Sequence, residues 1–107
     1  METLKVLGQV SPLATTDTTL YTVPALTETV ASTLTICNRG AAGTVRVAVR
    51  PLGVALATKH YIMYDTPVEA NSIVPLTIGI TLGSTDVITV QASTANFSFN
   101  LFGSEVS

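Results

Sequence analysis

The stretch that decides the fold is Thr44-Val45-Arg46-Val47-Ala48-Val49-Arg50, in which valine alternates with arginine or alanine. A period of two places the valines on one face of an extended chain and the other residues on the opposite face. A second stretch, Val74-Pro75-Leu76-Thr77-Ile78-Gly79-Ile80-Thr81-Leu82, repeats the pattern with aliphatic residues at every second position. Neither stretch has helical spacing, so both are predicted to be β-strands.

Weaker patterns of the same kind on either side predict six more strands, at residues 4–10, 20–23, 29–37, 60–65, 87–92 and 97–102. Threonine and valine, the two commonest residues, are β-branched and favour strands. Turn-forming residues separate the segments, as in Gly83-Ser84-Thr85-Asp86. About eight short strands with no helix layer predict an all-β fold, either a single-domain antiparallel β-sandwich or a jelly-roll-like barrel. The order of the strands stays open at this stage.

Residues 1–107 are predicted to form one domain, because a chain of this length has room for one hydrophobic core. Within it, residues 1–19 are expected to be either an N-terminal strand with a linker or an arm that reaches a neighbouring subunit. Pro75 cannot donate a ladder hydrogen bond, so its end of the strand is expected at a sheet edge or a bulge. An exposed edge strand offers unpaired backbone groups to a partner. Residues 4–10 and the strand ends are therefore the expected interface.

Charged residues make up only 11% of the chain, whereas a typical soluble domain has about 25%. A monomer with so few charged residues has too little charge to cover its surface, so part of that surface is expected to be covered by partner molecules. This predicts a homo-oligomer. The five basic residues are scattered and the net charge is −2, so nucleic acid is not an expected partner. Arg46 and Arg50, which share one side of a predicted strand, are instead expected to pair with acidic residues such as Asp65 or Glu69. No apolar stretch is long enough for a bilayer, and residues 1–5 lack signal-peptide features. We therefore expect synthesis in a cytoplasm and no membrane partner.

The sequence holds no recognisable catalytic or metal-binding constellation. Cys37 and His60 are the only cysteine and the only histidine, too few for a zinc site or a nucleophile with an oriented base. A pairing of these two residues is the one such arrangement that the sequence leaves open. We expect the chain not to be an enzyme, with no catalytic, cofactor-binding or metal-binding residue and no cofactor. Asp86 is expected to bond nearby backbone in a turn, and residues 38–43 are expected to form a hairpin turn.

Sugar binding usually relies on exposed aromatic side chains that stack on the sugar ring. The chain has no tryptophan. Tyr61 and Tyr64 stand an odd number of positions apart in a predicted strand, so they are expected to face opposite ways and to form no common platform.

Several stretches of the chain together resemble a known family. They are Leu20-Tyr21-Thr22-Val23-Pro24-Ala25, Ser32-Thr33-Leu34-Thr35-Ile36-Cys37-Asn38-Arg39-Gly40, Val47-Ala48-Val49-Arg50-Pro51-Leu52-Gly53, Lys59-His60-Tyr61-Ile62-Met63-Tyr64-Asp65, Leu76-Thr77-Ile78-Gly79-Ile80-Thr81-Leu82 and Phe97-Ser98-Phe99-Asn100-Leu101-Phe102-Gly103-Ser104-Glu105. The pattern, which covers nearly the whole chain from Leu20 onward, resembles small virion structural proteins of tailed phages, particularly phages of cyanobacteria and other aquatic bacteria. The resemblance to this family identifies no catalytic residue in the chain.

The resemblance implies a virion protein that is assembled in the host cytoplasm, and it leaves two placements open. A head decoration or cement protein, often a trimer, would bind the major capsid protein and stabilise the head. A tail, neck or fibre component would bind other tail proteins. Because no coiled coil or receptor-binding module is present, the head is favoured. A carbohydrate-binding β-sandwich module is the alternative from a different functional class.

Overall fold

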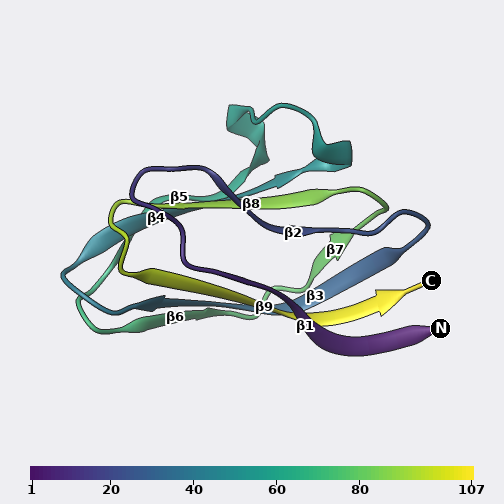
Figure 1. Cartoon of the computed structure of the whole chain (residues 1–107), viewed down its shortest axis with the longest axis horizontal. Helices are drawn as coiled ribbons and strands as arrows, with labels where there is room; N and C mark the ends of the chain where they lie inside the picture. The colour runs from purple at the N-terminus through teal and green to yellow at the C-terminus, as the bar shows by residue number, and fades with distance from the viewer.

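The computed structural model describes all 107 residues and contains nine strands and two short 3₁₀ turns (Figure 1). The strands are β1 (Glu2–Val10), β2 (Thr18–Thr22), β3 (Glu28–Asn38), β4 (Gly43–Arg50), β5 (Tyr61–Val68), β6 (Ile73–Leu76), β7 (Ile80–Leu82), β8 (Val87–Ala92) and β9 (Phe97–Val106), and the turns are η1 (Pro51–Gly53) and η2 (Thr58–His60). One antiparallel sheet has the order β1-β9-β3-β6, with β7 also paired to β3, and the other has the order β2-β8-β4-β5. The all-β sandwich is confirmed.

The strand order is that of a jelly roll. The first strand, β1, pairs with the last, β9, and β2 pairs with β8. Further in, β3 pairs with both β6 and β7, and β4 pairs with β5. Nested antiparallel pairs that are rolled into two facing sheets are the wiring of the double-sheet jelly roll. Of the two architectures that the sequence allowed, the chain therefore adopts a sandwich with jelly-roll connections.

The hydrophobic core lies between the two sheets and follows the alternation of the sequence. From β9, Phe97, Phe99 and Leu101 are fully buried, and from β4, Val45 and Val47 enter the same cluster. Burying one such side chain contributes about 1.5–3 kcal/mol to stability relative to leaving it in water. This alternation on long strands, repeated on both sheets, is what selects the sandwich.

The predicted strand from Val74 to Leu82 is wrong in one respect, because it is two strands. Residues 77–79 leave the sheet, and Gly79 has a φ of +64°, a conformation that glycine adopts without steric cost. β6 and β7 both pair with β3, but the register shifts by one residue between them. The break between β6 and β7 accommodates this shift in register. The shift is set by the pairing with β3, so it cannot be read from the alternation of residues 74–82. Pro75 lies in β6 at a sheet edge, as predicted.

The segment 38–43 is not the predicted hairpin turn, since it connects strands of different sheets. Asn38, which is 1% exposed, holds this corner through its side-chain amide. Its Nδ2 donates to the carbonyl oxygens of Ala41 at 2.8 Å and Glu69 at 3.1 Å. Its Oδ1 accepts from the backbone N–H of Gly40 at 3.0 Å. The amide thereby joins the β3–β4 corner to the β5–β6 turn.

The N-terminal segment lies against its own chain. β1 pairs with β9 over most of its length, and Leu7 reaches the core. Gly8 allows this edge to approach β2, because a Cβ at this position would overlap the carbonyl oxygen of Leu20. The following connection crosses to the other sheet, and the Thr15 backbone N–H donates to the Ala92 carbonyl oxygen at 2.7 Å.

Candidate functional site

The structure separates Cys37 from His60. Cys37 lies in β3 of one sheet, and His60 ends η2, beside β5 of the other sheet. β4 runs from the corner that follows Cys37 to the connection that holds His60, so the two residues lie at opposite ends of the sandwich. They form no nucleophile–base pair, and the one catalytic arrangement that the sequence left open is wrong.

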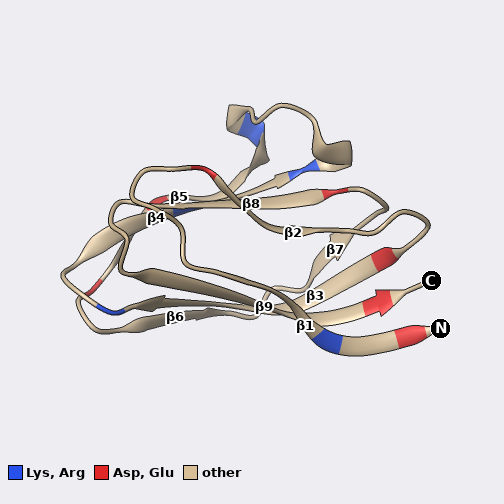
Figure 2. Ribbon diagram, viewed as in Figure 1, with Lys and Arg blue, Asp and Glu red and all other residues tan.

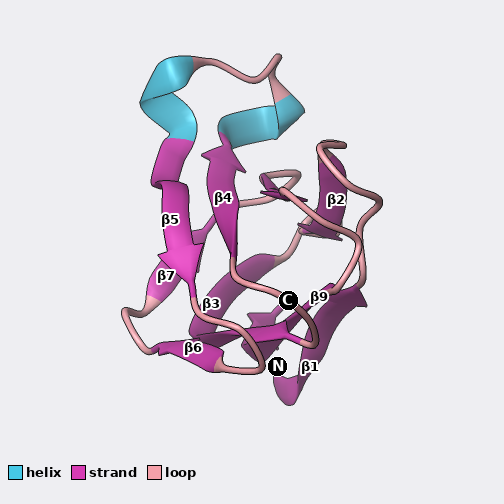
Figure 3. Cartoon of the chain, turned by 90° about the vertical axis from the view of Figure 1, so that its left-hand side faces the viewer, coloured by secondary structure: helices cyan, strands magenta, loops and turns pink.

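The connection between β4 and β5 projects beyond the strands, as Figure 3 shows. It contains the nonpolar run Pro51-Leu52-Gly53-Val54-Ala55-Leu56-Ala57, in which every residue except Leu56 is exposed. Connecting segments are normally polar, and an exposed run of apolar residues is expected only where it contacts another molecule. The sequence carried a signal for this feature, namely a nonpolar run without alternation between two strands.

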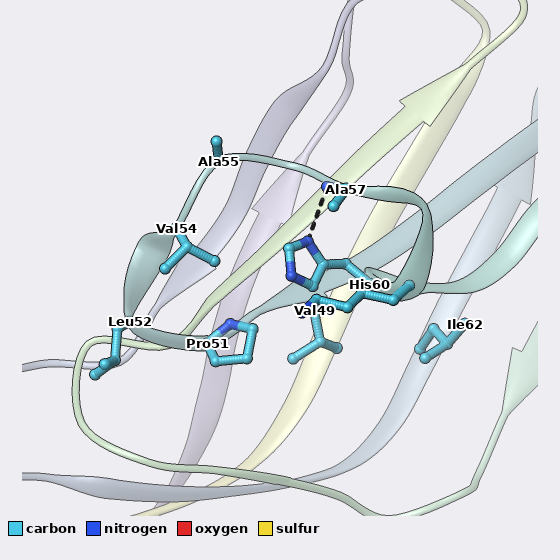
Figure 4. Close-up of a pocket in the computed structure, with 9 residues that line it drawn as sticks. Val49, Pro51, Leu52, Val54, Ala55, Ala57, His60 and Ile62 are labelled. Atoms are coloured by element: carbon cyan, nitrogen blue, oxygen red, sulfur yellow. Dashed lines mark hydrogen bonds between the residues drawn. The ribbon is translucent and has the colours of Figure 1, made fainter.

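An open hollow of about 830 Å³ lies between this connection and the neighbouring strand ends. Its lining is mostly hydrophobic and comprises Val49, Pro51, Leu52, Val54, Ala55, Ala57, Lys59, His60 and Ile62 (Figure 4). The His60 ring lies in the wall, where its Nδ1 accepts a hydrogen bond from the Ala57 backbone N–H at 3.0 Å. A neutral imidazole whose Nδ1 accepts carries its proton on Nε2. Lys59 is exposed at the same hollow, which has no carboxylate in its lining.

Two leucines stand out at this end of the sandwich. Leu26 is 92% exposed with a φ of +60°, and Leu52 is 73% exposed with a φ of +56°. For a residue with a Cβ the left-handed conformation costs about 1–2 kcal/mol. Asp86 and Ser84 of the β7–β8 turn hold both backbones in place. The Leu52 N–H donates to Asp86 Oδ1 at 2.9 Å, and the Leu26 N–H donates to Ser84 Oγ at 3.0 Å.

The prediction for Asp86 is therefore confirmed and extended. Its Oδ2 accepts from the Gly83 backbone N–H at 2.8 Å, as expected of a turn residue. Its Oδ1 also joins the β7–β8 turn to η1, a contact between distant segments that the sequence did not reveal. The β7–β8 turn thus links Leu26 on the β2–β3 turn to Leu52 and the hollow on the β4–β5 connection. We name Leu26, Leu52 and the lining of the hollow together the loop-end surface.

A second cluster lies on β4 and β5. Arg46 donates to Asp65 from Nε at 2.7 Å and from Nη2 at 3.3 Å, so the predicted pairing of Arg46 with Asp65 is confirmed. This contact lowers the pKa of Asp65 and raises that of Arg46. The Arg46 guanidinium also lies 4.2 Å from the centre of the Tyr64 ring. Because this ion pair is exposed to water, it contributes little to the stability of the fold.

The expected separation of Tyr61 and Tyr64 is wrong. Their ring centres are 4.8 Å apart in an edge-to-face arrangement. β5 is irregular against β4 on both sides of Met63, and Asp65 has a φ of +49°. A bulge shifts the alternation of side chains, so two residues an odd number of positions apart can share a side of the sheet. Tyr64, which is exposed, Tyr61 and the Arg46–Asp65 pair together form an aromatic, charged patch.

A partly buried polar contact between the sheets was also missed by the sequence analysis. Tyr21 on β2 donates its hydroxyl proton to Glu105 on β9, and the hydroxyls of Tyr21 and Thr29 are 2.9 Å apart. Burial and the bond to Glu105 raise the pKa of Tyr21 to about 12. The same bond, with Lys5 at 3.2 Å, lowers the pKa of Glu105. This contact fastens the two sheets near the chain termini and presents no group to a substrate.

Three surface features remain besides the polar contact between the sheets. No three His, Cys, Asp or Glu side chains gather as metal ligands would, and no helix is long and apolar enough to cross a membrane. The loop-end surface offers apolar contact beside an ammonium group. The Arg46 patch offers aromatic rings with a fixed ion pair. The β1 strand offers a free sheet edge, with Leu4 and Val6 exposed on it.

Comparisons with known proteins give no sequence match and one structural match of low similarity. No family model and no curated protein sequence matches the chain. A chain in the structure of infectious bursal disease virus, Gx strain, is similar in fold, with a TM-score of 0.43 and 16% sequence identity. The match covers 98% of this chain but only 28% of the viral chain.

Proposed function

We propose that this protein is a structural component of a virus particle, most specifically a phage head decoration or cement protein that binds the major capsid protein. In this proposal the protein acts by binding and not by catalysis. It is located in the virion, where its partners are other virion proteins and further copies of itself. The observation that carries the proposal is the loop-end surface, because a small domain that exposes Leu26, Leu52 and the run at 51–57 needs a protein partner to cover them.

Two further observations support this role, and the fold is compatible with it. The double-sheet jelly roll occurs repeatedly in viral capsid domains, although lectins share it, so the fold alone favours neither. The sequence stretches from Leu20 onward resemble small virion proteins of tailed phages. Finally, charged residues are only 11% of the chain, which suits broad contacts that are repeated over a lattice, where many weak interactions act together.

The experiment is a binding assay on particles made from the genome that encodes this chain, with its reading frame deleted. Purified protein is added to isolated heads and, separately, to isolated tails, and the bound copies are counted after sedimentation. We expect saturable binding to heads, at a fixed number of copies per lattice position, and a higher temperature of head disruption. Binding only to tails would instead establish a tail, neck or fibre component. Failure to bind either would refute the virion role.

A carbohydrate-binding module is the second candidate, and the patch of Tyr61, Tyr64, Arg46 and Asp65 is the observation that favours it. Aromatic rings provide stacking surface, and the charged pair provides hydrogen bonds for sugar hydroxyls. However, Arg46 already lies over the Tyr64 ring and is engaged by Asp65. A glycan array with the Tyr64→Ala variant as control tests this candidate. Binding that the variant loses would support it.

A further inference from the structure

We propose that the loop-end surface binds a second copy of this chain, with Leu26 of one copy seated in the hollow of the next. The inference rests on the proposed function, since it names the surface through which copies of a virion protein would associate. It goes further by assigning the contact to particular residues. The hollow is the receptor, and the β2–β3 turn that carries Leu26 is the inserted element.

The inserted element is shaped for insertion. Pro24, Ala25 and Leu26 are all exposed, and the Leu26 side chain has almost no contact within its own chain. Its left-handed backbone is fixed by the bond to Ser84 and by the Thr85 N–H, which donates to the Val23 carbonyl oxygen at 3.1 Å. The turn therefore presents a leucine in a defined position, and binding costs little conformational freedom.

The receptor is suited to that side chain. Val49, Val54 and Ile62 line the hollow, and Val54 and Ile62 remain partly exposed in the single chain. The volume of about 830 Å³ is larger than one leucine requires, so neighbouring residues of the turn can enter with it. An apolar side chain seated in an apolar pocket is the usual centre of a protein interface.

Charge identifies the occupant as a second copy. Two residues after Leu26 comes Glu28, which is exposed, and the exposed Glu2 lies across β9 from it, because both pair with Val106. The hollow carries Lys59 and no carboxylate. In Figure 2 the end that holds the termini carries several acidic residues and one basic residue, Lys5, which is paired with Glu105, whereas the projecting connection carries a basic residue. An apolar turn flanked by carboxylates thus meets an apolar hollow with an ammonium group.

Each copy carries both elements on the loop-end surface, so the contact closes as a twofold dimer when two copies exchange turns, or as a larger cyclic ring. Each copy inserts its own turn and receives that of another copy, which generates a ring if the rotation between copies closes. A cyclic oligomer of this kind would place the free β1 edge and the Arg46 patch outside the contact. It would also cover the leucines that the single chain leaves in water.

The test measures self-association of the purified full chain by sedimentation equilibrium and light scattering over a range of concentrations. Leu26→Asn removes the inserted side chain, and asparagine tolerates the left-handed backbone better than leucine does, so the fold is preserved. We expect the association constant to fall by about tenfold or more. Leu13→Asn is the matched control, because Leu13 is 72% exposed but lies in the β1–β2 connection at the opposite end. It should associate like the unchanged protein.

A charge exchange tests the orientation of the contact. Glu28→Lys and Lys59→Glu should each weaken association, and the double variant should recover most of the loss, because the two charges face one another only across the interface. Additive loss in the double variant would overturn the assigned pairing. Monomeric behaviour of the unchanged protein at every concentration, or equal association by Leu26→Asn, would overturn the inference as a whole.

Binding to heads separates this inference from the proposed function. If the unchanged protein is monomeric yet decorates heads, and Leu26→Asn does not decorate them, the occupant of the surface is the capsid protein and the inference is wrong. If the chain associates through Leu26 but ignores both heads and tails, the inference stands and the virion role fails. Reduced association together with weaker, still measurable decoration by Leu26→Asn would support both.

Discussion

Replacing Asn38 by alanine should destabilise the fold far more than an ordinary surface substitution. The side chain is 1% exposed and makes three hydrogen bonds of 2.8 to 3.1 Å, to Ala41, Glu69 and Gly40. Each hydrogen bond contributes about 1 kcal/mol net to the free energy of unfolding, and a buried polar group that loses its hydrogen-bond partner and cannot reach water costs more. We therefore expect a loss of about 3 kcal/mol in the free energy of unfolding. That is a large part of the roughly 5–15 kcal/mol that stabilises a typical domain.

The assay is urea unfolding followed by far-ultraviolet circular dichroism, with thermal unfolding as a second measurement. A loss of about 3 kcal/mol lowers the midpoint temperature by roughly 12–24 °C in a domain of this size. Asn100→Ala is the matched control, because Asn100 has a single side-chain bond, to Gln9, on the exposed face of the sheet. It should change stability by less than about 0.5 kcal/mol.

An isosteric variant separates the hydrogen bonds from the packing. Asn38→Asp keeps the shape but turns a donor into a carboxylate oxygen that faces the carbonyl oxygens of Ala41 and Glu69. At neutral pH it should cost more than Asn38→Ala, since it buries an unpaired charge. If Asn38→Ala costs less than about 1 kcal/mol, or if Asn38→Asp is as stable as the unchanged protein, the amide does not hold this corner.

Three other predictions concern the contacts between the sheets. Gly8→Ala should lower the free energy of unfolding by about 1–3 kcal/mol, because its Cβ would overlap the Leu20 carbonyl oxygen. Gly83→Ala is the control, since the nearest atom to its Cβ would be Asp86 Oδ2 at 3.6 Å. Equal stability of both variants would contradict this packing. Absorbance titration should show one tyrosine that ionises only near pH 12, and Tyr21→Phe should abolish that step. Folding raises the pKa of Tyr21 from 10.0 to about 12. The stability that the protonated hydroxyl contributes is therefore present below pH 10.0 and is lost as the pH rises towards 12. Folding lowers the pKa of Glu105 from 4.5. The stability that the ionised carboxylate contributes is therefore present above pH 4.5 and is lost as the pH falls through the pKa of the folded state. Acid unfolding should show this loss, and an unchanged acid-unfolding profile in Glu105→Gln would disprove it.

Most of the strands could be predicted because alternation is a local property. Val45 and Val47 enter the core and Arg46 does not, as the stretch from Thr44 to Arg50 indicates. Where the register of a partner strand matters, local alternation fails. Tyr61 and Tyr64 meet because of irregular pairing between β5 and β4, and a bulge has no fixed sequence signature.

The polar contacts could not be predicted for a different reason. Asn38 bonds to residues about thirty positions away, and Tyr21 bonds to Glu105, more than eighty positions away. Which distant groups meet depends on how the sheets are ordered, and that order was left open. The polar contacts that the sequence did predict are the turn contact of Asp86 with the Gly83 N–H and the pair of Arg46 and Asp65 on two successive strands.

Leu26 and Leu52 on the loop-end surface each combine a positive φ with a strongly exposed apolar side chain, and this combination is the strongest reason to place function there. Asparagine at position 26 would relieve the left-handed backbone and would remove an exposed apolar side chain that packs against almost nothing in its own chain. A monomer therefore gains nothing from Leu26. The same reasoning applies to Leu52, which has a positive φ and is mostly exposed. Local rules that fail together, in one connected region, are expected at functional sites. We therefore propose that the contact that explains these leucines lies outside the single chain.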